Sequence, residues 1–160
     1  MLLYVTVGTN DLERSGRFYD AVLPLLGYRR QKQAEGEIGY GADDDVRCRF
    51  WIVEPFDREP ATFGNGVTIA LDAPSRAAVD AFHAAALANG GTDEGGPGIR
   101  PFHPNFYAAF VRDLDGNKLS IVCERPEQAH ATRRSRPLPW PPFDARRPLH
   151  PRSSPSSGTG

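Results

Sequence analysis

The chain has 160 residues, 39% hydrophobic and 24% charged, with a net charge of −1, which is the composition of one soluble globular domain. No apolar run reaches the roughly 18 residues of a transmembrane helix and the first residues lack the basic region of a signal peptide, so we expect a cytoplasmic protein with no membrane contact. Residues 1–124 hold twelve basic and eighteen acidic side chains, which argues against nucleic-acid binding by this part of the chain.

The first part of the chain predicts one strand, one helix and three further strands. Residues 3–7 alternate as a strand. Residues 12–26 then place apolar side chains at helical spacing, until Pro24 and Gly27 end or turn the helix. Three short strands follow at residues 28–33, 38–41 and 47–53.

After a linker at residues 56–64, the same order of elements begins again. Residues 67–71 predict a strand, and Ser75 is a candidate N-cap for a helix that stops at residues 89–91. A weak strand or a loop covers residues 92–100. A hairpin at residues 107–122 completes this part, with the turn dipeptide Asp115-Gly116, which suits a backbone that needs positive φ.

This duplication is the main indication of the fold. It predicts an α+β domain in which two βαβββ modules, at about residues 1–55 and 65–124, form one curved mixed sheet with a concave cleft. Cys48 and Cys123 lie inside strand-like runs without CxxC spacing, so we expect buried, reduced thiols.

The last part of the chain, residues 125–160, has a different composition. It holds eight of the fifteen prolines, and its seven Arg face two acidic residues. We expect a disordered or surface-lying segment. The Pro-rich sequence around Trp140 could also bind a partner protein as polyproline II, so an interaction module that uses this tail is one alternative function.

A second local pattern concerns the hairpin. Asp113, Asp115, Asn117 and Glu124 match four positions of a calcium-binding loop. The glycine that such a loop needs at its sixth position is Lys118, however, and the residues that follow alternate as a strand. We therefore interpret the match as a coincidence.

Taken in order, these motifs resemble the vicinal oxygen chelate superfamily, which contains glyoxalase I, bleomycin-resistance proteins and extradiol dioxygenases. The residues that carry the resemblance are Val5-Thr-Val-Gly8, Asp11-Leu-Glu-Arg-Ser15, Phe18-Tyr19, Leu26-Gly27-Tyr28, Gly64-Asn-Gly66, Ser75 to His83, His103-Pro104, Tyr107-Ala-Ala-Phe-Val-Arg-Asp113 and Asp115-Gly-Asn117. The resemblance covers about residues 1–124 and implies a homodimer. In metal-dependent members it also implies a divalent metal, held by a His on the first strand, a His on the first strand of the second module and a Glu on the last strand.

This sequence departs from the family pattern at all three shared ligand positions. Tyr4 stands where the first His would be, Thr68 stands at the second His, and Ser120 replaces the acid. Hydroxyl groups are poor ligands for a catalytic divalent ion at neutral pH, so we expect no metal and no cofactor. A divalent-metal enzyme of the glyoxalase or dioxygenase kind, with ligands placed elsewhere, is the alternative.

The favoured function is a metal-free protein that binds a small molecule in the cleft, like the drug-binding resistance members of the resembled family. The predicted ligand-binding residues are Tyr4, Trp51, Thr68, His103, Tyr107 and Ser120. The hydroxyls would bond the ligand, and the aromatic rings would wall the pocket. His103, in a loop at the rim, could be a ligand contact or a general base, or could serve loop packing alone. The hydroxyls could equally satisfy one another in a filled, inert cleft.

Overall fold

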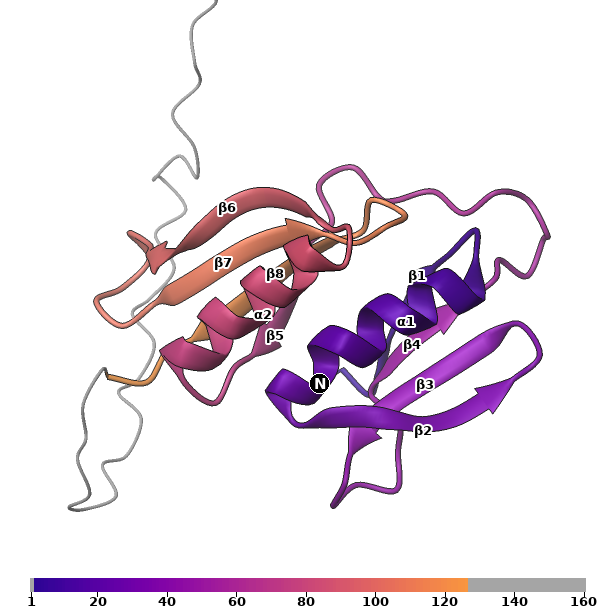
Figure 1. The fold of residues 1–160 in the computed structure, drawn as a ribbon, viewed down its shortest axis with the longest axis horizontal. Helices are drawn as coiled ribbons and strands as arrows, with labels where there is room; N and C mark the ends of the chain where they lie inside the picture. The colour runs from indigo at the N-terminus through magenta and orange to yellow at the C-terminus, as the bar shows by residue number, and fades with distance from the viewer. Residues whose placement is uncertain (1, 127–160) are drawn as a thin grey trace, which may run out of the picture. The chain divides into compact units, whose positions relative to one another are not determined.

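The computed structural model describes residues 2–126, which form two modules with the same order of elements (Figure 1). The first module consists of β1 (Val5–Gly8), α1 (Leu12–Val22), a 3-10 helix (Leu23–Leu26), β2 (Tyr28–Ala34), β3 (Glu37–Ala42) and β4 (Phe50–Val53). The second module consists of β5 (Ile69–Asp72), α2 (Arg76–Ala88), β6 (Thr92–Ile99), β7 (Tyr107–Arg112) and β8 (Lys118–Cys123). The predicted α+β class and the duplicated βαβββ order are confirmed.

The eight strands form two four-stranded mixed sheets, in the orders β1-β4-β3-β2 and β5-β8-β7-β6. In each sheet the first strand of the module pairs in parallel with the last, and the other neighbours are antiparallel. The predicted single sheet is thus divided, because no ladder joins β1 to β5. Each helix lies across one face of its own sheet (Figure 1), and we call the opposite face the outer face.

A hydrophobic core joins the two modules. The helices α1 and α2 contact each other, and the helix-facing side chains of both sheets pack around them. The largest fully buried members of this core are Tyr19, Tyr40, Phe18, Phe50 and Phe82. Because residues from both modules share the core, residues 2–126 are stabilised as a unit.

Helix boundaries follow the local signals in the sequence. The Asp11 carboxylate caps α1 by accepting a hydrogen bond from the backbone N–H of Arg14 at 2.9 Å. The Ser75 hydroxyl caps α2 in the same way, with the N–H of Ala78 at 3.1 Å. After the 3-10 helix the chain turns at Gly27, whose φ of 85° is unfavourable for any residue with a Cβ.

Several strand boundaries differ from the prediction. Strands β1, β4 and β5 begin two or three residues later than expected, at Val5, Phe50 and Ile69. The preceding backbone groups bond elsewhere: the Leu3 carbonyl accepts from the Arg49 side chain at 3.1 Å, and the N–H of residue 67 closes a turn on residue 64. Strand β6 spans almost all of the segment for which a weak strand or a loop was expected. It pairs with β7 at both ends, and two bulges interrupt the ladder between Asp93 and Gly98.

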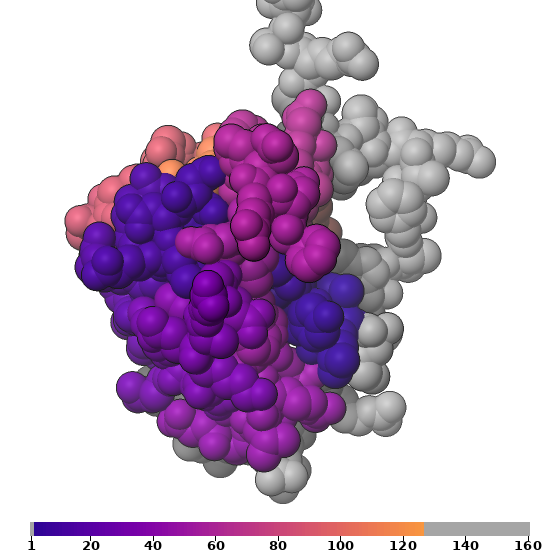
Figure 2. All heavy atoms as spheres, turned by 90° about the vertical axis from the view of Figure 1, so that its right-hand side faces the viewer, coloured from indigo at the N-terminus to yellow at the C-terminus, as the bar shows by residue number. Residues whose placement is uncertain are grey.

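The β7–β8 hairpin is confirmed, with Gly116 at a φ of 88° in the turn. The linker between the modules forms hydrogen bonds and packing contacts near this turn. Asn10 forms two hydrogen bonds with the backbone of Ala61, at 3.0 and 2.8 Å, and the Phe63 ring packs against Gly116. Figure 2, viewed from the side on which the linker lies in Figure 1, shows linker residues in magenta at the surface.

Three further predictions concern the chain as a whole. Cys48 and Cys123 are buried free thiols, as expected. Within residues 2–126 no helix has the length and apolar character needed to cross a bilayer. Residues 2–126 all belong to one compact unit. The predictions for the tail, including its Trp140 segment, fall almost wholly outside the described residues.

Candidate ligand-binding site

Of the three hydroxyl-bearing residues, Ser120 lies on the outer face of the second sheet, and Tyr4 and Thr68 directly precede β1 and β5. Their neighbours along the strands pack into the core: Val5, Ile69, Leu119 and Ile121. Strand alternation therefore turns Tyr4, Thr68 and Ser120 away from the helices. Their exposure differs, because Tyr4 is 54% exposed and Ser120 only 4%, and Thr68 lies in the exposed segment just before β5.

Trp51 lies on the outer face of the first sheet, where its ring covers a glycine. Strand β4 places Trp51 between Thr6 of β1 and Gly39 of β3. A Cβ atom at position 39 would lie 2.8 Å from the Trp51 ring, so the ring can rest on the β3 backbone only because that residue is Gly. The ring is partly exposed and can contact a ligand.

Tyr107 lies on the opposite side of its sheet from Ser120. It pairs with Cys123, a core residue, and its hydroxyl donates to the Asp80 carboxylate of α2 at 2.7 Å. The guanidinium carbon of Arg76 lies 5.1 Å from the centre of the Tyr107 ring. The structure therefore separates Tyr107 from the three hydroxyl residues and places it between the sheet and α2.

His103 stabilises the loop between β6 and β7. Its Nδ1 accepts a hydrogen bond from the backbone N–H of Asn105 at 3.1 Å. Its Nε2 lies 3.1 Å from the Glu124 carboxylate, and with Nδ1 acting as acceptor it is Nε2 that carries the proton and donates. Both ring nitrogens are engaged, so this geometry offers no free nitrogen for a general base.

A groove of about 530 Å³ opens between β1 and β5, where the two sheets are not joined. We call it the seam groove. Most of its lining is apolar and comes from both modules, for example Leu3, Leu26, Phe50 and Ile69. Of the six predicted site residues, Tyr4 alone is in this lining.

Four of the five charged side chains that line the seam groove form ion pairs with one another. Arg49 lies 2.6 Å from Asp45, and Arg125 lies 3.2 Å from Asp72. Hydrogen bonds from Arg47 and Arg49 lower the pKa of Asp45 to about 2, so this carboxylate stays ionised. The groove is therefore an apolar slot with two ion pairs along its lining, which were not predicted from the sequence.

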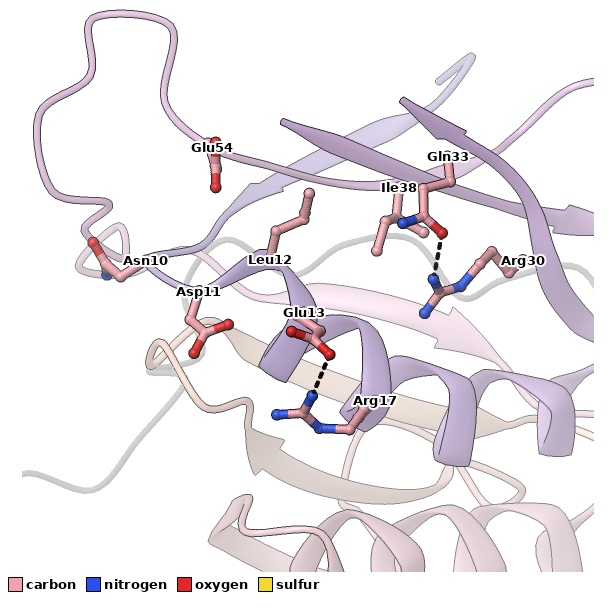
Figure 3. A pocket seen from close by; sticks show the side chains of 9 residues that line it. All are labelled: Asn10, Asp11, Leu12, Glu13, Arg17, Arg30, Gln33, Ile38 and Glu54. Atoms are coloured by element: carbon pink, nitrogen blue, oxygen red, sulfur yellow. Dashed lines mark hydrogen bonds and ion pairs between the residues drawn. The ribbon is translucent and has the colours of Figure 1, made fainter. Parts of the chain in front are cut away.

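A second groove, of about 810 Å³, lies between α1 and the β2–β3 hairpin (Figure 3). Leu12 and Ile38 supply its apolar surface. Its charged groups lie on open surface: Glu13 and Arg17 form an ion pair at 3.2 Å with side chains 88% and 65% exposed. None of the six predicted residues lines this groove, and its exposed ion pair is typical of a solvated surface.

Asp115 connects the hairpin turn to the start of α1. Its side chain is 3% exposed and accepts hydrogen bonds from the hydroxyls of Thr9 at 2.7 Å and Ser15 at 2.9 Å. It also accepts from the backbone and side chain of Asn10, both at 3.1 Å, and pairs with Arg14 at 2.9 Å. These contacts link residues about one hundred positions apart and join the two modules.

Asp113 is bonded in a similar way. One carboxylate oxygen accepts from the backbone N–H groups of Asp115 and Asn117, at 3.0 and 2.8 Å. The other accepts from the buried Tyr19 hydroxyl at 2.6 Å and from the Asn117 side chain at 2.8 Å. The carboxylates of Asp113 and Asp115, two of the three in the calcium-like pattern, are thus occupied by donors within the protein, which supports the interpretation of that pattern as a coincidence.

The residues present do not fit a divalent metal. Within residues 2–126, no three His, Cys, Asp or Glu side chains lie close enough together to hold one. At the positions where metal-dependent relatives carry imidazole or carboxylate, the donors are the neutral hydroxyls of Tyr4, Thr68 and Ser120. No chemistry through a metal follows from this arrangement.

Comparisons with known proteins agree with the fold. The sequence profile described as Glyoxalase/Bleomycin resistance protein/Dioxygenase superfamily matches residues 1–121. A glyoxalase/bleomycin resistance protein from Albidiferax ferrireducens T118 is 42% identical, with a TM-score of 0.68 over 77% of this chain and 97% of the other. A glyoxalase-related enzyme from Fulvimarina pelagi is 21% identical, with a TM-score of 0.60 over 77% and 87%. The fosfomycin resistance protein FosX from Mesorhizobium loti is 19% identical, with a TM-score of 0.56 over 77% and 91%. No curated protein matches the chain.

Proposed function

The chain belongs to the Glyoxalase/Bleomycin resistance protein/Dioxygenase superfamily, and from this membership we propose that it binds a small molecule at the seam between its sheets without a metal. The observation that carries the proposal is the seam groove. Its volume of about 530 Å³ is within the range of small-molecule sites, and its lining is mostly apolar with a few polar groups. Such a site favours a compact apolar ligand with a limited number of hydrogen-bonding groups.

The outer-face hydroxyls supply the polar contacts in this proposal. Tyr4 lines the groove directly, and Ser120 pairs with Ala70, which also lines it. A hydroxyl both donates and accepts, so it can bond a neutral ligand group without the desolvation penalty of a charge. The drug-binding resistance members of the family give the precedent for a role without catalysis.

Replacing Tyr4 with alanine is expected to weaken ligand binding by about tenfold, because the ligand loses an aromatic contact and a hydrogen bond. The measurement is ligand-observed NMR with a fragment library, followed by calorimetric titration of the hits. Phe56→Ala, which removes a fully exposed ring from the linker, is the matched control and should leave the affinity unchanged. Adding a chelator should have no effect; loss of binding with chelator would contradict the metal-independent assignment.

We also propose a homodimer, since several apolar side chains near the first strands of the modules are exposed. Leu2 is 80% exposed, Leu3 55% and Val67 57%. Light scattering after gel filtration should give twice the chain mass of 17.6 kDa. Leu3→Glu should shift the mass toward the monomer, and Val46→Glu, at an exposed position between β3 and β4, should not. An unchanged dimer in Leu3→Glu would exclude this surface as the interface.

A further inference from the structure

The outer face of the second sheet places two cations, Arg100 and Lys118, beside the ring of Phe110, and a third, Arg112, over the ring of Phe63. The Arg100 guanidinium carbon lies 5.2 Å from the centre of the Phe110 ring, and Lys118 Nζ lies 5.6 Å from it. Arg112 pairs with Lys118 across the β7–β8 ladder, so alternation puts Phe110, Arg112 and Lys118 on the same face. We call Arg100, Phe110, Arg112 and Lys118 the basic face.

Positive charge exceeds negative charge at the basic face. Among residues 2–126, the one carboxylate that forms an ion pair with these cations is Glu94, which bonds Arg112 at 2.7 Å and Lys118 at 3.0 Å. The Arg100 guanidinium donates to the carbonyls of Gly96 and Ala108. Arg112 and Lys118 thus share one carboxylate, whereas Arg100 is held by backbone carbonyls and lies close enough to the Asp93 carboxylate to interact with its charge.

The cations of the basic face are partly exposed and can be reached by a ligand. The side chains of Arg112, Lys118 and Glu94 are 30%, 27% and 28% exposed. The glycines of β6 leave room beside them, because a Cβ atom at Gly96 or Gly98 would meet nothing within 4 Å.

The basic face is connected to the seam groove by one row of paired residues. Ala70 lines the groove, pairs with Ser120 of β8, and Ser120 in turn pairs with Phe110 of β7. Two strand spacings separate the ends of this row, which is about 10 Å. A single small molecule can therefore span the distance from Ala70, at the groove, to the cations beside Phe110.

We infer that the ligand is an organic acid: its apolar body occupies the seam groove and its acidic group binds at the basic face, near Arg100 and Lys118. This inference rests on the proposed binding function and names the ligand class. Guanidinium and ammonium groups form charge-assisted hydrogen bonds with carboxylate and phosphate, which are stronger than bonds between neutral groups. The partly exposed Phe110 ring supplies the apolar contact next to the acidic group.

The test compares three probes that share one ring system: naphthoate, naphthyl phosphate and naphthalenemethanol. Calorimetric titration of the full chain at low salt should show at least one of the two acids binding about tenfold more tightly than the alcohol. The better acid identifies carboxylate or phosphate as the preferred group. Equal affinities for the acids and the alcohol would overturn the inference and leave the seam groove as a neutral site; no binding of either acid would also overturn it.

Three variants assign the effect to the basic face. Lys118→Met should reduce the affinity for the acid about tenfold and leave the affinity for the alcohol unchanged. The matched control is Lys32→Met, on β2 of the other sheet, which should change neither affinity. Glu94→Gln should increase acid affinity, because it releases Arg112 and Lys118 from their shared carboxylate. An unfolded variant cannot gain affinity, so no change or a decrease in Glu94→Gln contradicts the assignment. The Tyr4→Ala experiment reports on the groove independently.

Discussion

Replacing Asp115 with alanine is expected to lower the free energy of unfolding of the domain by about 3 kcal/mol. The Asp115 carboxylate is 3% exposed and accepts hydrogen bonds from four donor groups of Thr9, Asn10 and Ser15, beside an ion pair with Arg14. Without it, these donors lose their partner at the junction of the two modules. Urea unfolding at neutral pH measures the loss.

Two further variants show whether the loss of stability comes from the charge of Asp115 and from its position in the fold. Asp115→Asn keeps the shape but removes the charge, and we expect an intermediate loss. Asp44→Ala changes an exposed turn residue and should cost less than about 0.5 kcal/mol. If Asp115→Ala proved as mild as Asp44→Ala, the hydrogen bonds of Asp115 would not contribute to holding the modules together.

The contribution of Asp115 to the free energy of unfolding is expected to decrease in acid. Burial raises the pKa of Asp115, but hydrogen bonds from Thr9, Asn10 and Ser15 outweigh it and hold the pKa below the ordinary value of 3.8. The carboxylate therefore stabilises the fold above that value, and this stabilisation is lost as pH falls through the lowered pKa. The difference between wild type and Asp115→Ala should shrink accordingly in acid.

Raising the pH above about 10 is expected to destabilise the domain by about 1.4 kcal/mol per pH unit for each of two buried tyrosines. Burial, and then the neighbouring Asp113, raise the pKa of Tyr19 well above its ordinary value of 10.0. Burial, and then Asp20, likewise raise the pKa of Tyr40, whose hydroxyl donates to that carboxylate at 3.0 Å. Above pH 10 the unfolded chain releases these protons and the folded chain retains them, so stability falls as pH rises.

Phenylalanine at each position tests this dependence. Tyr19→Phe and Tyr40→Phe should each remove one tyrosine's share of the alkaline slope, and the double variant should remove both. At neutral pH, Tyr19→Phe should also lose about 1–2 kcal/mol, because Asp113 loses a donor at 2.6 Å. The measurement is urea unfolding at a series of alkaline pH values. Slopes equal to that of wild type would show that these hydroxyls ionise in the folded protein.

Much of the fold can be predicted because its signals are local. The caps at Asp11 and Ser75 and the turn at Asp115-Gly116 each depend on residues within a few positions of one another. The candidate site was harder to predict. Tyr107 begins a strand whose next two residues are both alanine, so alternation of apolar side chains could not indicate which face it occupies.

The sequence by itself determines the repeated order of strands and helices, because this order depends on short-range periodicity. It also determines that Tyr4, Thr68 and Ser120 are not metal-ligand residue types, because this depends on residue identity alone. Tertiary structure alone decides that the sheets stay separate at β1 and β5, that the seam groove forms there and that Arg100 reaches Phe110. These features arise from pairing register and from contacts between distant residues. The hydrogen bond from Thr9 to Asp115, which spans 106 positions, is one such contact, and no local pattern encodes it.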